Sequence, residues 1–246
     1  MEYPNRLGEE RIFPNGDVVR IIKYNNSQDI DVLFVKQNII VKKRRYHNFK
    51  IMNIKSREEK KFRNTAYIGN GDNKSQYNNV KCKIYKKWKS MIERCYCMDI
   101  VSYTYVEVCK DWHNFQKFAE WYRENYNPKI MGNWHLDKDI LSDEGKIYSP
   151  EYCCFVPGEI NMSFCRKKKQ NIILPSGVFL VHGKYFRSVL VKNGKNIYLG
   201  YFKNEIEAFK EYKKEKEKHI KEMAQKYKSV LPKKTFNALI NYSVKE

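Results

Sequence analysis

The stretch HLDKDILSDEGKIYSPEYCCFVPGEIN, from His135 to Asn161, decides how the middle of the chain folds. It begins as a short strand-like run that carries a histidine and two aspartates. Residues i and i+2 of a strand point to the same face, so His135 and Asp137 are expected to lie on one side. Asp139 follows two residues later. A histidine beside carboxylates suits acid–base or metal-assisted chemistry, although the favoured explanation of His135 is a polar residue at a sheet edge.

The chain of 246 residues carries 48 Lys and Arg against 28 Asp and Glu, a formal net charge of +20. This charge attracts polyanions, so nucleic acid is the leading partner class and an anionic membrane surface is the alternative. No apolar run approaches the roughly 18 residues that a membrane-spanning helix needs. The opening residues MEYPNRLGEERIF lack the apolar core of a secretory signal, so we expect a cytoplasmic protein.

The seven cysteines are odd in number and lack paired CxxC spacing. Together with the absence of a secretory signal, this indicates reduced thiols that pack as small hydrophobic side chains. The alternative is a zinc site assembled from Cys95, Cys97, Cys109 and Cys153, which the spacing does not favour.

Residues 1–60 predict a small β-sheet or half-barrel module. The runs Asp17–Tyr24 and Asp29–Lys36 are rich in Val, Ile and Tyr, and Asn25–Gln28 between them is a turn signal. A third strand is expected over Asn38–Lys43. The stretch Ile68–Asn79, rich in Gly, Asn and Lys, is expected to be a loop.

Residues 80–165 are predicted to form two amphipathic helices, followed by the stretch His135–Asn161 described above. In VKCKIYKKWKSMIERCY one helical face collects apolar side chains, with the lysines opposite: Ile84, Trp88, Met91, Ile92 and Cys95. The run WHNFQKFAEWYRENY repeats this spacing and should stop at Asn127-Pro128. A strand is expected between the helices, over Ser102–Cys109.

Residues 172–230 predict three strands and one helix. Asn193-Gly194 between β-branched and aromatic runs is the strongest hairpin signal in the chain. The expected elements are strands Val178–Val181, Lys184–Val191 and Asn196–Phe202, and a helix from Glu205 to about Lys226. Residues 231–246 are expected to add a short helix, and the basic run Arg166–Gln170 is a linker. The fold class is therefore α+β.

The third segment resembles the Apetala-two/ethylene-response-factor type of DNA-binding domain. The residues that carry the resemblance are Ser176-Gly177-Val178, Lys184-Tyr185, Gly194-Lys195, Ile197-Tyr198-Leu199-Gly200-Tyr201-Phe202, Glu207-Ala208 and Tyr212. Such domains lay a three-stranded antiparallel sheet into the DNA major groove and brace it with the helix, and the resemblance implies the same here.

The middle segment resembles HNH homing-endonuclease-like proteins of phages. The matching residues are Arg94-Cys95-Tyr96, Val108-Cys109 with Trp112 and Phe115, Leu136-Asp137-Lys138, Tyr148-Ser149-Pro150-Glu151, Cys153 and Asn161. Proteins of this type often carry an Apetala-type domain downstream, as this chain does. The resemblance implies a ββα-metal finger and a phage-infected or lysogenic bacterial host cell.

An HNH finger holds one divalent ion, so the resemblance implies Mg²⁺ or Mn²⁺ as cofactor. Asp137 falls on the metal ligand of the family pattern, Asp139 is a second candidate ligand, and Asn161 matches the final Asn.

The finger departs from the family pattern at two positions. Lys138 stands where the family has its catalytic His, and Tyr152 stands where related sequences have Asn. In a catalytic finger Lys138 or His135 would handle the proton. However, the flanking carboxylates should keep Lys138 charged.

Strand alternation in the third segment predicts which side chains of the central strand face outward. Tyr185, Arg187 and Val189 are expected toward the helix. Because Arg187 stands where a small core residue is usual, the opposite facing stays open. The outward set, which could stack on bases or contact a protein, includes Phe179, Phe186, Leu190 and Tyr198. The residues expected to contact DNA are Arg166, Lys167, Lys168, Lys169, Lys184, Arg187, Lys192, Lys195, Asn196 and Tyr198.

The expected function is that of a DNA-binding protein of the HNH-endonuclease-like group, with double-stranded DNA as partner and metal-dependent phosphodiester hydrolysis as the reaction. Two alternatives stay open. One is a catalytically inactive DNA-binding regulator on the same scaffold. The other is a phage protein that inhibits a host defence complex, a nucleic-acid-binding assembly, through protein–protein contact.

Overall fold

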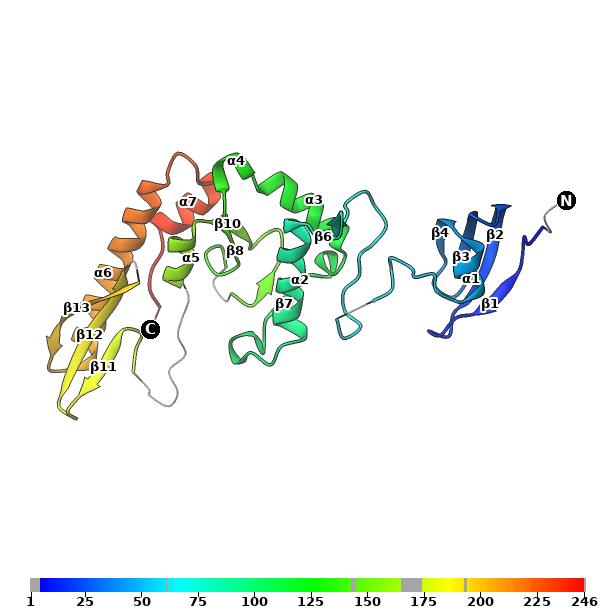
Figure 1. Cartoon of the computed structure of the whole chain (residues 1–246). Coiled ribbons are helices and arrows are strands. Elements are labelled where there is room, and N and C mark those ends of the chain that lie inside the picture. Colours follow the sequence, from blue (N-terminus) through cyan, green and yellow to red (C-terminus); the bar gives the residue numbers. More distant parts are fainter. Residues whose placement is uncertain (1–4, 61, 143–144, 165–173, 193, 246) are drawn as a thin grey trace.

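The computed structural model describes residues 5–60, 62–142, 145–164, 174–192 and 194–245. The protein is a mixed α and β structure, 34% helical and 27% strand, which confirms the α+β prediction. Figure 1 shows an elongated arrangement with a four-stranded sheet at one end, a three-stranded sheet at the other and most of the helices between them.

The N-terminal module is an antiparallel sheet in the order β1-β2-β3-β4. Its elements are β1 (Glu10–Ile12), β2 (Val18–Asn26), β3 (Asp29–Phe34), β4 (Ile39–Arg44) and the short helix α1 (Tyr46–Lys50). One face of the sheet is apolar and packs on Phe49 of α1. Strand β1 was missed by the sequence analysis because three residues are too few to show an alternation.

A long loop joins this module to the middle of the chain. It includes a small hairpin of β5 (Gln76–Tyr77) and β6 (Val80–Lys81), which the sequence analysis had placed largely within a loop. The side-chain amide of Gln116 donates to the carbonyls of Ile68 and Asn73, both at 3.1 Å. These bonds fasten the loop to the first turn of a helix in the middle segment.

The middle segment contains helices and short strands around one aromatic core. Its elements are α2 (Lys83–Tyr96), η1 (Val101–Tyr103), β7 (Glu107–Val108), η2 (Lys110–His113), α3 (Phe115–Asn125), α4 (Pro128–Met131), β8 (His135–Asp137), β9 (Ile147–Tyr148), β10 (Cys154–Val156) and α5 (Gly158–Phe164). The predicted strand Ser102–Cys109 is wrong over most of its length. Its first part forms the 3-10 turn η1, where the Thr104 hydroxyl donates to the Val101 carbonyl at 3.0 Å.

Helices α2 and α3 pack through the aromatic faces that their spacing predicted. Trp88 and Phe115 lie fully buried with ring centroids 5.5 Å apart. The Trp88 indole N–H donates to the Trp112 carbonyl at 2.7 Å, so the large ring is buried without an unsatisfied donor. The side chain of Asn114 accepts from the Gln116 N–H and caps α3.

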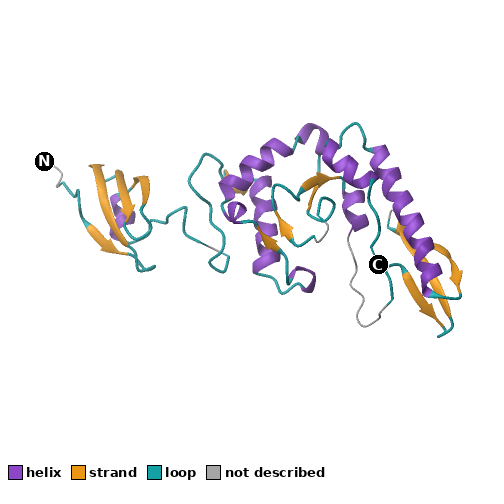
Figure 2. Ribbon diagram, turned by 180° about the vertical axis from the view of Figure 1, so that it is seen from behind, coloured by secondary structure: helices purple, strands orange, loops and turns teal. Residues whose placement is uncertain are grey.

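The C-terminal part contains β11 (Val178–Val181), β12 (Tyr185–Lys192), β13 (Lys195–Phe202), α6 (Glu205–Lys226) and α7 (Lys233–Ile240). The strands form an antiparallel sheet in the order β11-β12-β13. The bounds of β11 and α6 are those predicted. Figure 2 shows α6 lying along one side of this sheet.

Helix α6 belongs to two cores. Near its start Ala208 and Phe209 pack with Val178 under the three-stranded sheet. Near its end Ile220, Met223 and Ala224 lie in the core of the middle segment, together with Leu239 of α7. The predicted ranges 80–165 and 172–230 therefore share a core through this helix.

The cysteines that the structure describes are free, and Cys153 and Cys154 are buried. Burial raises the pKa of Cys154 to about 12, so its thiol stays protonated at neutral pH. Among the helices of the described residues, none is long and apolar enough to cross a membrane.

Gly177 precedes β11 at φ +78°, and a Cβ there would overlap the Tyr212 ring of α6. Gly183 has a similar φ of +65° with nothing within 4 Å of a built Cβ, which makes it a matched control. Gly183→Ala should therefore lower the free energy of unfolding by only about 1–2 kcal/mol, through backbone strain.

We expect Gly177→Ala to lower the free energy of unfolding by roughly 1–3 kcal/mol more than Gly183→Ala does, since the Tyr212 ring must also move. Chemical denaturation followed by circular dichroism measures both variants. Equal losses would mean that the glycine does not set the approach of α6 to the sheet.

Candidate functional site

The stretch His135–Asn161, called the finger from here on, folds as two antiparallel strands followed by a helix. Strand β8 pairs with β10 so that Asp137 lies opposite Cys154 and His135 lies opposite Val156. Helix α5 begins two residues after β10, at Gly158, and Asn161 lies half-buried within it. The backbone thus places Asp137, at the end of β8, and Asn161, in the helix, within one small unit.

Asp137 is only 4% exposed and shapes the turn that follows it. Its Oδ1 accepts the backbone N–H groups of Asp139 at 2.8 Å and Ile140 at 2.9 Å. Burial, and then the nearby Asp139 carboxylate, raise the pKa of Asp137 to about 6. One oxygen of this carboxylate is therefore already committed to the backbone.

Lys138 is turned inward and ion-paired within the finger. Only 8% of the residue is exposed, and its Nζ lies 2.7 Å from Oδ1 of Asp139. The same ammonium lies 5.9 Å from the Tyr103 ring centroid and 5.8 Å from that of Tyr148. Rings at this distance attract a cation through their negative faces. The ammonium is thus already engaged by a carboxylate and lies near two rings, an arrangement that favours a structural role over that of a general base.

Two basic side chains of α2 line the same region, and the sequence analysis missed both. Arg94 donates to the Tyr148 hydroxyl at 3.4 Å, and its guanidinium lies 5.4 Å from the Tyr103 ring centroid. Lys87 is half-buried and its Nζ reaches the Trp134 carbonyl at 3.5 Å. The helical spacing had assigned the lysines of α2 to the solvent side, but long basic side chains often bury their stems.

His135 and Asp137 lie in different surroundings although they are two residues apart in β8. His135 is exposed beside Gly158, whereas Asp137 is buried. Partial desolvation of the ring, and then the charge of Lys87, lower the pKa of His135, which favours the neutral imidazole. A neutral imidazole can accept a proton, but the Asp137 carboxylate serves its own turn and forms no hydrogen bond with His135 in the described part of the chain.

The described geometry fits a divalent cation poorly. Mg²⁺ and Mn²⁺ need several oxygen ligands, and Asp137 and Asp139 are the two carboxylates that were predicted to supply them. The Lys138 ammonium already occupies Asp139, and backbone N–H groups occupy Asp137 Oδ1. Among the described residues no group of three His, Cys, Asp or Glu side chains is placed to hold a metal ion, zinc included. Residues 143–144 of the same loop lie outside the described residues.

The outward face of the three-stranded sheet is the second candidate site. Arg187 lies opposite Phe179 of β11 and Tyr201 of β13. Its guanidinium carbon lies 5.6 Å from the Phe179 ring centroid and 5.5 Å from that of Tyr198. Tyr198 and Tyr201 are 65% and 63% exposed. The Arg187 guanidinium is thus held between two rings on the outward sheet face. The residue is half-buried there, and its Nε is buried without a hydrogen-bond partner among the described residues.

The predicted facing of β12 is wrong. Phe186, Ser188 and Leu190 face the helix and are partly or fully buried, so Phe186 and Leu190 do not belong to an outward patch. Arg187 faces outward because its charge avoids the apolar layer under α6. In the pairing of β12 with β13, Ser188 lies opposite Gly200 and the next residue, Val189, lies opposite Tyr198. Leu199 therefore has no partner in β12 and forms a bulge in β13. This bulge lets both Tyr198 and Tyr201 face outward.

The other predicted DNA contacts lie around this face or outside the described residues. Lys195 and Asn196 are exposed near the hairpin tip, and the Lys184 ammonium lies 5.6 Å from the Tyr185 ring centroid. Lys192 forms an ion pair with Glu222 of α6 at 2.9 Å. The run Arg166, Lys167, Lys168 and Lys169 lies outside the described residues.

No protein-family model, curated protein or solved structure matches this chain.

Asp137→Asn separates the charge of this side chain from its hydrogen bonds. A carboxyl with a folded pKa of about 6 binds more protons in the folded than in the unfolded state between about pH 4 and 6. Stability from this group is therefore present at low pH and lost as pH rises through 6. We expect the parent to lose stability relative to Asp137→Asn over that interval, because Asn keeps an acceptor for both N–H groups.

Asp137→Ala is the contrasting variant, since it leaves those two N–H groups unsatisfied. It should be less stable than Asp137→Asn at all pH values by about 1–3 kcal/mol. Thermal and urea unfolding at pH 4, 5, 6 and 7 measure both differences. A parent–Asn difference that does not change with pH would show that Asp137 is not a perturbed buried carboxyl.

Proposed function

We propose that this chain is a DNA-binding protein that contacts the duplex with the outward face of the β11–β13 sheet and uses the finger as a scaffold. The observation that carries the proposal is Arg187 held between Phe179 and Tyr198 on an open sheet face. Arg is the side chain most often used to read guanine edges in the major groove, and exposed rings contact bases or thymine methyl groups.

Two further features support it. The order of three antiparallel strands and a packed helix agrees with the resemblance to the Apetala-type domain, and the strand–strand–helix order of β8, β10 and α5 agrees with the resemblance to an HNH finger. The net charge of +20 supplies the attraction to phosphates on which affinity for DNA mainly depends.

The proposal does not include hydrolysis of DNA, because Asp137 and Asp139 already have partners within the finger. A metal-dependent nuclease uses its ion to stabilise charge on the phosphate and the leaving oxygen. The residues here commit the two candidate carboxylates to Lys138 and to the backbone. The alternative of a protein-binding apolar patch is weakened as well, since Phe186 and Leu190 face α6.

Arg187→Ala should weaken binding to duplex DNA about tenfold or more, since an arginine that contacts a base edge is worth roughly 1–3 kcal/mol. Arg187→Lys should not restore binding, because an ammonium has neither the planar fork nor the stacking of a guanidinium. Fluorescence anisotropy with a mixed pool of labelled duplexes measures the affinities. Arg20→Ala in β2 changes the charge equally and is the control.

Unchanged affinity for Arg187→Ala, or a parent affinity that stays constant between about 50 and 200 mM salt, would overturn DNA binding by this face.

The parent should leave supercoiled plasmid intact in Mg²⁺, in Mn²⁺ and in EDTA, because Lys138 neutralises Asp139 where an ion would need it. Gel electrophoresis after prolonged incubation, with a purified metal-dependent nuclease as positive control, provides the measurement. Nicking by the parent that EDTA blocks and that Asp139→Ala abolishes would show the scaffold interpretation to be wrong.

A further inference from the structure

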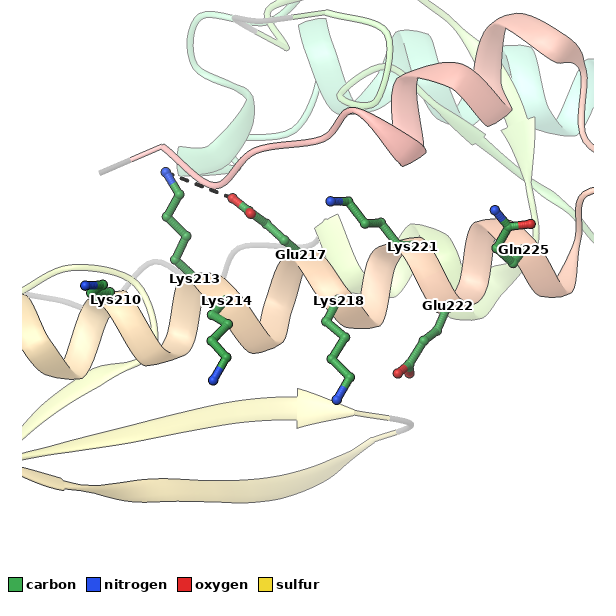
Figure 3. Close-up of a pocket in the computed structure, with 8 residues that line it drawn as sticks. All are labelled: Lys210, Lys213, Lys214, Glu217, Lys218, Lys221, Glu222 and Gln225. Atoms are coloured by element: carbon green, nitrogen blue, oxygen red, sulfur yellow. Dashed lines mark ion pairs between the residues drawn. The ribbon is translucent and has the colours of Figure 1, made fainter.

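A row of lysines runs along the side of α6 that faces solvent (Figure 3). We call Lys210, Lys214, Lys218 and Lys221 the lysine stripe. Lys213 and Glu217 flank the stripe on the side of the C-terminal segment, and Glu222 flanks it on the side of the hairpin (Figure 3). The positions of the stripe are four, four and three residues apart, which is the spacing of neighbours along one helical face.

The lysine stripe is not neutralised by the acidic side chains near it. Glu222 forms an ion pair with Lys192 of the hairpin at 2.9 Å. Glu217 accepts from the Ser243 hydroxyl at 3.1 Å and the Val244 N–H at 3.0 Å, and it lies 4.0 Å from Lys213. Lys210, Lys218 and Lys221 form no ion pair with any residue that the structure describes.

One member of the stripe, Lys214, has an acidic partner. It lies 3.5 Å from Glu211, and its side chain is 68% exposed. Exposed pairs of this kind contribute about 0–1 kcal/mol, so Lys214 remains available to a partner.

The stripe lies on the solvent side of α6, and within it Lys214 and Lys218 extend toward the side of the β12–β13 hairpin, as Figure 3 shows. Ala208 and Phe209 at one end of α6, and Ile220 and Met223 at the other, point into the two cores. On a helix with 3.6 residues per turn the stripe lies opposite this buried side. The outward sheet face with Arg187 is the opposite surface of the same sheet–helix layer. A single straight segment of duplex cannot lie on both.

The arrangement suits an extended polyanion better than a small anion. Successive lysines of the stripe are about 5–6 Å apart along the helix axis, and the whole stripe spans roughly 16 Å. A single phosphate would need several donors that converge on one point. A line of flexible point charges, in contrast, follows successive phosphates of a nucleic-acid strand.

The usual reason for a charged helix face is solubility, and such faces carry both signs of charge interspersed. Here Glu222 is drawn to the hairpin and Glu217 to the C-terminal segment, while Glu211 pairs with Lys214 alone, which leaves Lys210, Lys218 and Lys221 without an ion pair among the described residues. We propose that the lysine stripe is a second nucleic-acid backbone contact, so that one molecule bridges two duplex segments. This proposal rests on the proposed function for the sheet face.

The experiment compares four proteins. The stripe variant combines Lys210→Gln, Lys214→Gln, Lys218→Gln and Lys221→Gln, since Gln keeps the helix propensity and the length of the side chain. The control combines Lys23→Gln, Lys42→Gln, Lys50→Gln and Lys55→Gln in and next to the N-terminal module, where all four are exposed and the change in net charge is the same. The parent and Arg187→Ala complete the set. Circular dichroism and thermal unfolding establish that each is folded.

Two readouts separate the surfaces. Anisotropy with one short labelled duplex reports binding, and energy transfer between donor-labelled and acceptor-labelled duplexes reports bridging. The stripe variant should bind one duplex within about threefold of the control, since the sheet face remains intact, and should lose at least tenfold in bridging. Arg187→Ala should lose both binding and bridging. The control should bridge like the parent.

Each failure has its own signature. Bridging by the stripe variant equal to that of the control would overturn the stripe as a second contact and leave the sheet face standing. Normal binding by Arg187→Ala, with binding lost in the stripe variant, would overturn the proposed function of the sheet and keep the stripe as a nucleic-acid surface. A parent that binds no duplex at low salt would overturn both proposals.

Discussion

The burial of one helix in two cores is the constraint on which the C-terminal two-thirds of the molecule depends. The start of α6 covers the three-stranded sheet through Ala208 and Phe209, and its end completes the core around α2 and α3. Helix α5 is clasped to the same helix. Glu159 receives hydrogen bonds from Lys226, at 2.7 Å, and from the Tyr227 hydroxyl, while Lys216 donates to the Ser163 carbonyl at 2.6 Å. Because the same helix is part of both cores, it fixes the orientation of the finger relative to the sheet face.

Within the finger, the Lys138 ammonium limits the ability of Asp137 and Asp139 to bind a metal ion. Two carboxylates two residues apart repel each other, and burial of Asp137 adds a desolvation penalty. In the HNH pattern that the sequence resembles, a divalent ion compensates such charges. Here the Lys138 ammonium pairs with Asp139 and lies near two tyrosine rings, so the chain supplies the compensating charge itself. The Lys138 side chain is 10% exposed and that of Asp139 is 44% exposed, so loss of Asp139 would leave a largely buried ammonium without its carboxylate partner.

The sequence predicted elements better than it predicted facing. Asn193-Gly194 located the β12–β13 hairpin and the helical spacing after Glu205 located α6, because turn chemistry and a 3.6-residue period are local signals. Alternation in β12 offered two sets of side chains, and aromatic residues in both sets made either one a plausible core. The bulge at Leu199, which brings Tyr198 and Tyr201 to one face, has no local signal. Arg94 and Lys87 were missed because their roles depend on Tyr148 and Trp134, which are distant in the sequence.

The shared helix also explains how the lysine stripe can exist. Like charges three or four residues apart destabilise an isolated helix by a few tenths of a kcal/mol per pair, so the stripe opposes the formation of α6. The helix forms nevertheless because both of its ends are buried, where each apolar side chain contributes roughly 1.5–3 kcal/mol. The ion pair of Lys192 with Glu222 ties the hairpin to the same helix. A rigid helix with its apolar side fixed in two cores therefore holds cations in a line that a free helix would not keep. The backbone that carries the stripe is already ordered, so a partner with a regular row of negative charges would have to order only the lysine side chains.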